Sequence, residues 1–244
     1  MTPTPKVVLV PGAWSTPAFY DGLDTCLSER GFESITVQHP STGAEPPTKT
    51  LEDDVSQLHG TLEHLCDSGD DIIVVAHSYG GLVSSGAVEG LERPTRQSQG
   101  KSGGVLTIVY VVAFVVPKGV SLVGASGGQL MPWIKVEGSY AYNNIGPEDA
   151  FHDLTPSERD RWTASLTHTS LPVFHGTASH EPWRLIPTAY ILGEEDQMLP
   201  VAIQEHMVGM LGTSETYRLK TSHHPFLSRP QDVADIVAGL WSKL

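Results

Sequence analysis

The chain has 244 residues, with 28 acidic side chains against 15 Lys and Arg side chains, which gives a formal net charge of −13. An α/β domain of this length can bury a substantial core without a metal or a disulfide. Nucleic acids and anionic membranes are bound largely through Lys and Arg side chains, so the acidic balance predicts neither kind of partner. The expected partner is a small-molecule substrate, bound by a monomer or a homodimer.

Six short apolar runs alternate with helical patterns along the chain. Most of these runs are rich in Val and Ile without strict alternation, which is typical of strands in a parallel sheet that is covered on both faces. The expected strands are 7–10, 34–38, 72–76, 105–112, 187–192 and 215–219. The pattern predicts an α/β fold with a mainly parallel central sheet flanked by helices.

Amphipathic helices are expected between these runs. From Leu51 onward, apolar residues recur at steps of four and three, and Thr50 with Asp53 offers a capping box at the start of that helix. The last helix is expected to begin near Pro230. Cys26 and Cys66 fall within predicted helices, and we expect both to be small buried hydrophobic residues.

Two stretches interrupt the alternation of strands and helices. Residues 92–104 contain no apolar residue and are predicted to form a long mobile surface loop. Residues 117–186 are rich in Gly, Pro, His and Trp, and they contain one clear helix start at Thr155. We expect a helical cap at 117–186, inserted after the strand 105–112 into a core of residues 1–116 and 187–244.

Membrane and export signals are weak in this sequence. Residues 1–6 carry no hydrophobic signal core, and the longest nearly unbroken apolar run, 105–116, is too short to cross a bilayer. We therefore expect a cytoplasmic protein.

The strongest local motif is AHSYGG at 76–81, which directly follows the expected strand 72–76. A nucleophile elbow is a sharp turn from strand to helix that lifts a serine above the sheet. Small residues two positions before and after the serine make this turn possible. Ala76 and Gly80 hold those positions, so Ser78 is the candidate nucleophile.

A serine hydroxyl is a weak nucleophile until a base takes its proton, and that base needs a third group to orient it. After such an elbow, the acid and then the histidine follow the serine along the chain. Asp196 is the candidate acid because it lies in the loop after the expected strand 187–192. Glu194 and Glu195 are alternatives to it. His223 is the candidate base, and its neighbour His224 is the alternative.

An oxyanion hole needs two backbone N–H groups that point at the developing negative charge. We expect them from Tyr79, after the nucleophile, and from Ala13, in the loop after the first strand. The histidines show no spacing typical of metal ligands, so neither a metal nor a cofactor is expected. The candidate substrate-binding residues are Trp14, His77, Trp133, Trp162 and Trp183, which would suit a small to medium apolar or aromatic substrate.

With these motifs in order, the sequence resembles the α/β-hydrolase superfamily over nearly its full length, and more narrowly its small esterase and hydroxynitrile-lyase-like branch. The segments that carry the resemblance are VVLVPGAWSTPAFYDGL (7–23), AHSYGG (76–81), YVVAFVVPKG (110–119), ILGEEDQMLP (191–200) and SHHPFLSRPQDVADI (222–236). The resemblance implies that Ser78, Asp196 and His223 are nucleophile, acid and base, and that Ala13 and Tyr79 supply the oxyanion donors. It also implies that AFHDLTPSERDRW (150–162) belongs to the cap.

Three positions depart from the family pattern. Pro11 stands where many members have His, Ala76 replaces the first Gly of the elbow, and His224 follows the base where a small residue is common. The lyases of this branch carry Thr at the position of Gly12 and Lys at the position of His224, and without that Lys a departing cyanide loses its nearest positive charge. The expected function is a serine hydrolase of the carboxylesterase or lactonase type, acting on an ester, lactone or thioester. A C–C bond-cleaving lyase with the same triad is the alternative, followed by a non-catalytic ligand-binding protein.

Overall fold

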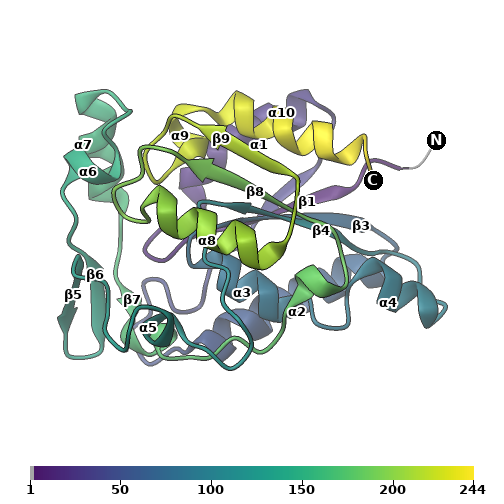
Figure 1. Ribbon diagram of the computed structural model, residues 1–244, viewed down its shortest axis with the longest axis horizontal. Coiled ribbons are helices and arrows are strands. Elements are labelled where there is room, and N and C mark those ends of the chain that lie inside the picture. Colours follow the sequence, from purple (N-terminus) through teal and green to yellow (C-terminus); the bar gives the residue numbers. More distant parts are fainter. Residues whose placement is uncertain (1–2) are drawn as a thin grey trace.

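A six-stranded parallel sheet forms the centre of the computed structural model, which describes residues 3–244 (Figure 1). Its strands are Lys6–Val10 (β1), Ser34–Thr36 (β2), Asp71–His77 (β3), Gly104–Val111 (β4), Thr188–Gly193 (β8) and Thr216–Leu219 (β9). They lie in the order β2-β1-β3-β4-β8-β9, and each neighbouring pair is parallel. The six predicted strands and the mainly parallel sheet are confirmed. Residues 1 and 2, part of the segment expected to lack a signal core, lie outside the described residues.

The apolar runs form central strands because both faces of the sheet are covered. β3 is buried from Ile72 to His77, and β8 is buried along its whole length. Because the pairing is parallel, all strands run in the same direction. The last residue of β1, Val10, pairs with Ala76 of β3, and the last residue of β8, Gly193, pairs with Leu219 of β9. The loops after β1, β3, β8 and β9 therefore emerge at one edge, where side chains from distant parts of the sequence can meet.

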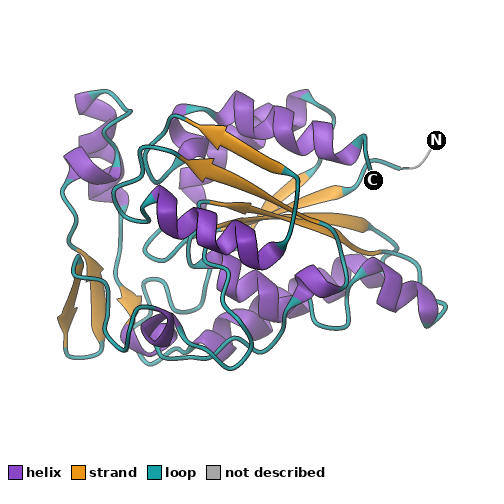
Figure 2. Cartoon of the chain, in the orientation of Figure 1, coloured by secondary structure: helices purple, strands orange, loops and turns teal. Residues whose placement is uncertain are grey.

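Helices pack on both faces of this sheet (Figures 1 and 2). Asp21–Glu29 (α1), Pro225–Ser228 (α9) and Pro230–Trp241 (α10) lie above it in the view of Figure 1, and Leu51–Asp67 (α2) and Gly80–Ala87 (α3) lie below it. Val201–Leu211 (α8) packs against β8. The predicted capping box at the start of α2 is present. Cys26 in α1 and Cys66 in α2 are both buried, as predicted.

The prediction of a mobile surface loop over 92–104 is wrong, because Arg93–Ser98 forms a helix, α4. Arg96 is only 2% exposed. Its guanidinium donates to the Gly103 carbonyl at 3.1 Å and pairs with the Asp67 carboxylate at 2.9 Å. A charged side chain can be buried when it is paired and hydrogen-bonded in this way. The prediction failed because it took the absence of apolar residues to mean that the segment is exposed, whereas this segment is held by a buried, paired arginine.

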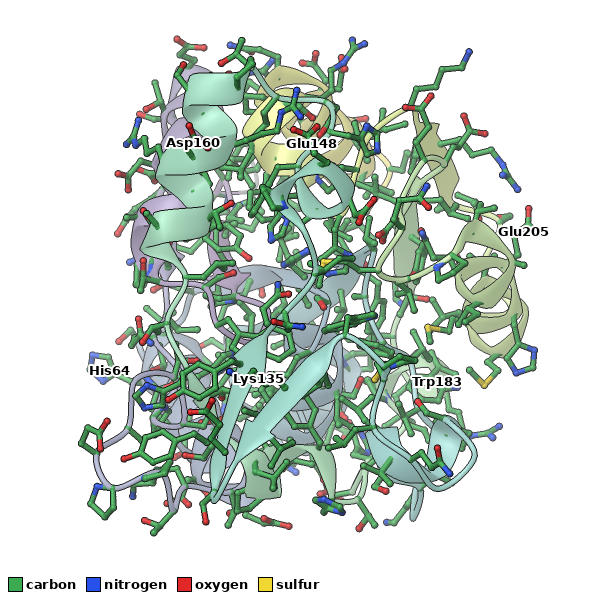
Figure 3. All side chains as sticks on the ribbon, turned by 90° about the vertical axis from the view of Figure 1, so that its left-hand side faces the viewer. His64, Lys135, Glu148, Asp160, Trp183 and Glu205 are labelled. Carbon is green, nitrogen blue, oxygen red and sulfur yellow. The ribbon has the colours of Figure 1, made fainter. Side chains whose placement is uncertain are left out.

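The cap segment, residues 117–186, lies beside the edge where the parallel strands end (Figure 2). It contains the helices Leu122–Ala125 (α5), Pro147–Ala150 (α6) and Pro156–Ser165 (α7), and α7 begins at the predicted helix start with a capping box between Thr155 and Glu158. It also contains an antiparallel sheet of Ile134–Glu137 (β5), Tyr140–Asn143 (β6) and Thr169–Ser170 (β7), which the sequence analysis did not predict. Figure 3 shows this side of the molecule, with Lys135 on β5, Glu148 on α6 and Asp160 on α7. The division into a core and a separate cap domain stays a prediction.

Across 3–244, none of the helices combines the length and the apolar character that crossing a membrane requires.

Candidate active site

The turn between β3 and α3 places Ser78 at its apex. Ser78 has a φ of 50°, in the left-handed region that residues with a Cβ rarely adopt. A Cβ on Gly80 would collide with the Pro11 carbonyl oxygen, and a Cβ on Gly81 would lie 2.5 Å from the Phe114 carbonyl oxygen. The two glycines let the new helix pass this close to the neighbouring backbone, and the turn holds the serine in its strained conformation.

Three loops bring the predicted triad together at this edge of the sheet. The Ser78 Oγ lies 3.0 Å from the His223 Nε2, and the His223 Nδ1 lies 2.7 Å from the Asp196 Oδ2. The three residues follow β3, β9 and β8, and each is at most 6% exposed. The geometry thus places the candidate nucleophile, the candidate base and the candidate orienting carboxylate in one hydrogen-bonded chain.

The structure distinguishes Asp196 from the two alternative carboxylates, Glu194 and Glu195. The other oxygen of Asp196, Oδ1, accepts the backbone N–H groups of Met198 at 2.7 Å and Leu199 at 3.1 Å. Glu194 lies 3.6 Å from the Arg218 guanidinium instead, and Glu195 is exposed. Only Asp196 has its carboxylate against the His223 ring.

Two further histidines surround His223 without entering the hydrogen-bonded chain. The His77 Nε2 lies 2.8 Å from the His223 carbonyl oxygen, so His77 donates to the backbone of the base. His224 is buried and stacks on Phe151 with a centroid separation of 4.7 Å. Of the two adjacent histidines, His223 is the one that lies between Ser78 and Asp196. The buried His77 ring supports the His223 loop through Nε2, and its contact with a substrate stays a prediction.

Burial sets the charge of these two histidines. It lowers the pKa of His77 well below the ordinary value, and the nearby rings of His223 and His224 lower it further. The pKa of His224 is also lowered well below the ordinary histidine value, mainly by burial and to a smaller extent by the charge of His223. Both rings are therefore neutral in the folded protein near neutral pH.

We expect the free energy of unfolding to fall between pH 7.5 and pH 5.5. In the unfolded chain, His77 and His224 take up protons below their ordinary pKa of 6.5, whereas in the folded protein they stay neutral. Each such group removes up to about 1.4 kcal/mol of stability per pH unit below that value, and buried His39, whose pKa burial also lowers, adds to the loss. Urea unfolding at the two pH values measures this loss. The His224→Phe variant should lose less through these groups, and an unchanged pH dependence in that variant would contradict the assignment.

The candidate oxyanion donors flank Ser78. Tyr79 follows it directly, and the Gly12 backbone presses against the elbow so closely that a Cβ there would lie 3.0 Å from the Ser78 Cβ. Ala13 comes next in that loop. Within residues 3–244, neither the Ala13 N–H nor the Tyr79 N–H has a carbonyl acceptor in the loops and turns. Their role as oxyanion donors stays a prediction.

The four predicted tryptophans lie in three different places. Trp14 is buried, donates from Nε1 to the Ala141 carbonyl at 2.9 Å and packs edge-on against Trp133 at 5.6 Å. Trp162 packs on Phe19 at 4.7 Å and lines a surface cavity. Trp183 lines a cavity with Thr188, at the start of β8, whereas Asp196 follows the end of that strand. The structure does not bring Trp183 to Ser78, and Figure 3 shows it well below α6 and α7.

Two cavities are lined by residues that contact the triad or its neighbours, although no triad residue is in either lining. The first, the apolar cavity, has a volume of about 370 Å³ and is lined by residues that include Phe114, Leu130, Met131, Met198, Leu199 and Met207. The Phe114 N–H donates to the Ser78 carbonyl at 3.0 Å, so this cavity adjoins the elbow. The second has a volume of about 340 Å³ and is lined by cap residues that include Phe151, which stacks on His224.

Sequence reasoning missed the apolar lining of the first cavity. Phe114, Met198 and Leu199 all lie in segments that carry the family resemblance, YVVAFVVPKG and ILGEEDQMLP. Phe114 follows β4 closely, and Met198 and Leu199 follow Asp196 closely. These positions could have indicated that the three side chains lie near the site. No cluster of three or more metal-ligating side chains occurs in the part of the chain that the structure describes.

Comparisons with known proteins identify the family and the fold of this chain. The sequence model described as the alpha/beta hydrolase family matches residues 7–236. The alpha/beta hydrolase nvfD of Aspergillus novofumigatus is 29% identical over 243 residues, covering 96% of this chain and 95% of the relative. The probable hydrolase R7 of a Phoma species is 25% identical over 250 residues, covering 97% and 98%. The crystal structure of polyneuridine aldehyde esterase has a TM-score of 0.78 at 19% identity, covering 98% of this chain and 100% of that one, which shows a shared fold.

Proposed function

Because the chain belongs to the alpha/beta hydrolase family and is an esterase-type hydrolase, we propose that it cleaves a carboxylic ester, lactone or thioester through an acyl-enzyme on Ser78. The hydrogen-bonded chain from Asp196 through His223 to Ser78 is the observation that carries this proposal. A binding pocket alone has no need of three such groups in this order and geometry.

The reaction begins with the Ser78 Oγ, which attacks the substrate carbonyl while the His223 Nε2 takes its proton. The tetrahedral intermediate collapses, the alcohol or thiol leaves with the proton that His223 returns, and the acyl group stays on Ser78. Water then attacks the acyl group by the same steps, releases the carboxylic acid and restores the serine. Asp196 holds the imidazole and stabilises its charged form, and the N–H groups of Ala13 and Tyr79 bind the oxyanion.

The apolar cavity supports a flexible, medium-sized apolar group as the part of the substrate next to the carbonyl. Three methionines contribute to its lining, and methionine side chains adapt to irregular apolar shapes. Trp14 and Trp133 pack against each other and are proposed to contribute aromatic surface on the cap side. A cytoplasmic location and a monomeric or dimeric state stay predictions.

We expect the purified protein to hydrolyse 4-nitrophenyl esters and to prefer the butyryl ester to the acetyl ester by about tenfold in kcat/KM. Each buried CH₂ group contributes about 0.8 kcal/mol, and the butyryl chain places two more of them in the apolar cavity. In H₂¹⁸O, the carboxylic acid product should gain one ¹⁸O atom per turnover.

The Met131→Trp variant is the matched control for the substrate, because a larger side chain would fill the apolar cavity without touching the triad. It should reduce the preference for the butyryl ester and leave acetyl turnover nearly unchanged. Equal kcat/KM for acetyl, butyryl and bulky aryl esters would overturn the substrate class. An acid product without ¹⁸O, with the label in 4-nitrophenol instead, would contradict attack at the ester carbonyl.

A further inference from the structure

Three consecutive residues of the cap segment contact the two loops that carry the acid and the base. They are Phe151, His152 and Asp153, which follow α6, the helix that carries Glu148 in Figure 3. Each of them contacts a residue next to a member of the predicted triad, and none of them is itself part of it. These three residues are called the clip below.

Asp153 makes the strongest of these contacts. Its Oδ2 accepts the backbone N–H of Ser222 at 3.0 Å and the hydroxyl of Ser228 at 2.5 Å. Ser222 directly precedes His223, and Ser228 lies in α9, the short helix that follows the same loop. A carboxylate that accepts a backbone N–H forms a charge-assisted hydrogen bond, which is about twice as strong as a neutral one. Asp153 therefore ties both ends of the His223 loop to one atom of the cap segment.

The other two residues of the clip reach further parts of the same site. The His152 Nε2 lies 3.0 Å from the carbonyl oxygen of Glu195, the residue before Asp196. Phe151 is 1% exposed and stacks on His224, the residue after the base. The clip thus contacts the acid loop once and the base loop on both sides of His223.

The two loops are also joined to each other directly. The Glu195 N–H donates to the Thr221 carbonyl at 3.2 Å, and a Cβ on Gly193 would lie only 2.9 Å from the Ser222 carbonyl. A triad needs its groups within about 0.5 Å of the productive geometry, and loops reach that precision only when neighbouring contacts hold them. We propose that Phe151, His152 and Asp153 are positioning residues through which the cap segment holds Asp196 and His223 in register with Ser78. This proposal rests on the hydrolase function proposed above.

The test compares Asp153→Ala, Asp153→Asn and Asp149→Ala in the hydrolysis of 4-nitrophenyl butyrate. Asp153→Ala should lower kcat by about tenfold or more while KM stays within about twofold, because the substrate cavity is untouched and the His223 loop loses its anchor. Asp153→Asn keeps an oxygen that can accept from Ser222 and Ser228, so it should recover kcat to within about threefold of wild type. Asp149→Ala removes an exposed carboxylate from α6 of the same segment and should match wild type.

Hydrogen exchange gives a second readout that needs no substrate. Asp153→Ala should speed exchange in the peptide 219–224, whereas Asp149→Ala should not. If Asp153→Ala does not fold, Ser228→Ala can be used in its place. It removes the hydroxyl partner of Asp153 and leaves the Ser222 N–H, so it should show the same effects with a smaller magnitude. Equal kcat and equal exchange in the Asp153→Ala and Asp149→Ala proteins would overturn the clip. Absence of ester turnover by the wild-type protein would overturn the proposed function, and the exchange measurement would still decide the clip.

Discussion

Replacing Ser78 with alanine is expected to lower kcat/KM for 4-nitrophenyl butyrate by about 10⁵-fold or more. The variant has no atom that can form the acyl-enzyme, and in other serine hydrolases the loss of the nucleophile alone costs about 10⁶ in kcat. Residual activity above the uncatalysed rate would come from the oxyanion donors and from substrate binding. Steady-state kinetics with wild-type and variant proteins, purified in the same way, give the ratio.

Ser84→Ala is the matched control for this measurement. Ser84 is a buried serine in α3 that follows Ser78 in the sequence, and within the described residues its Oγ has no hydrogen-bond partner. Its replacement should leave kcat/KM within a few fold of wild type. A folded Ser78→Ala protein that keeps a tenth or more of the wild-type activity would contradict the mechanism.

Replacing Asp196 with asparagine is expected to lower kcat by about 10⁴-fold. The asparagine amide can donate to the His223 Nδ1, which would place the imidazole proton on Nε2 and leave no acceptor for the Ser78 hydroxyl. A loss of this size is known for the equivalent substitution in another serine hydrolase. KM should change little, because Asp196 lies behind the histidine and its oxygens are occupied by His223, Met198 and Leu199.

The neighbouring glutamates serve as controls for Asp196. Glu194→Gln and Glu195→Gln remove carboxylates that the sequence alone could not distinguish from Asp196. Glu194 faces Arg218 and Glu195 is exposed, so both variants should retain kcat within a few fold of wild type. A loss with either glutamine variant as large as that with Asp196→Asn would show that the carboxylate has been assigned to the wrong residue.

Much of the fold could be predicted because local sequence and tertiary structure agree there. The Val- and Ile-rich runs of β3, β4 and β8 are buried on both faces, so their composition predicts their place in a parallel sheet. The elbow could be predicted because its turn requires a small residue two positions after Ser78, at Gly80. Asp196 and His223 could be nominated because each follows a strand whose end lies at the same edge of the sheet.

The remaining features depend on contacts between distant residues, which a local pattern does not contain. Arg96 is buried because its guanidinium pairs with Asp67 and donates to the Gly103 carbonyl. A pattern of apolar residues does not predict such contacts. The position of Trp183 at the opposite end of β8, and the hydrogen bond from His77 to the His223 backbone, were not predicted for the same reason. The choice between Asp196 and its neighbouring glutamates also required the position of His223.

The central claim, an activated serine at position 78, is tested most directly by intact-protein mass spectrometry after exposure to a fluorophosphonate. The account predicts one adduct per chain, formed as the Ser78 oxygen displaces fluoride from phosphorus, located at Ser78 by peptide mapping and absent from the Ser78→Ala protein. An adduct that maps to another residue or persists in Ser78→Ala, or no adduct at all on the folded wild-type protein, would contradict it.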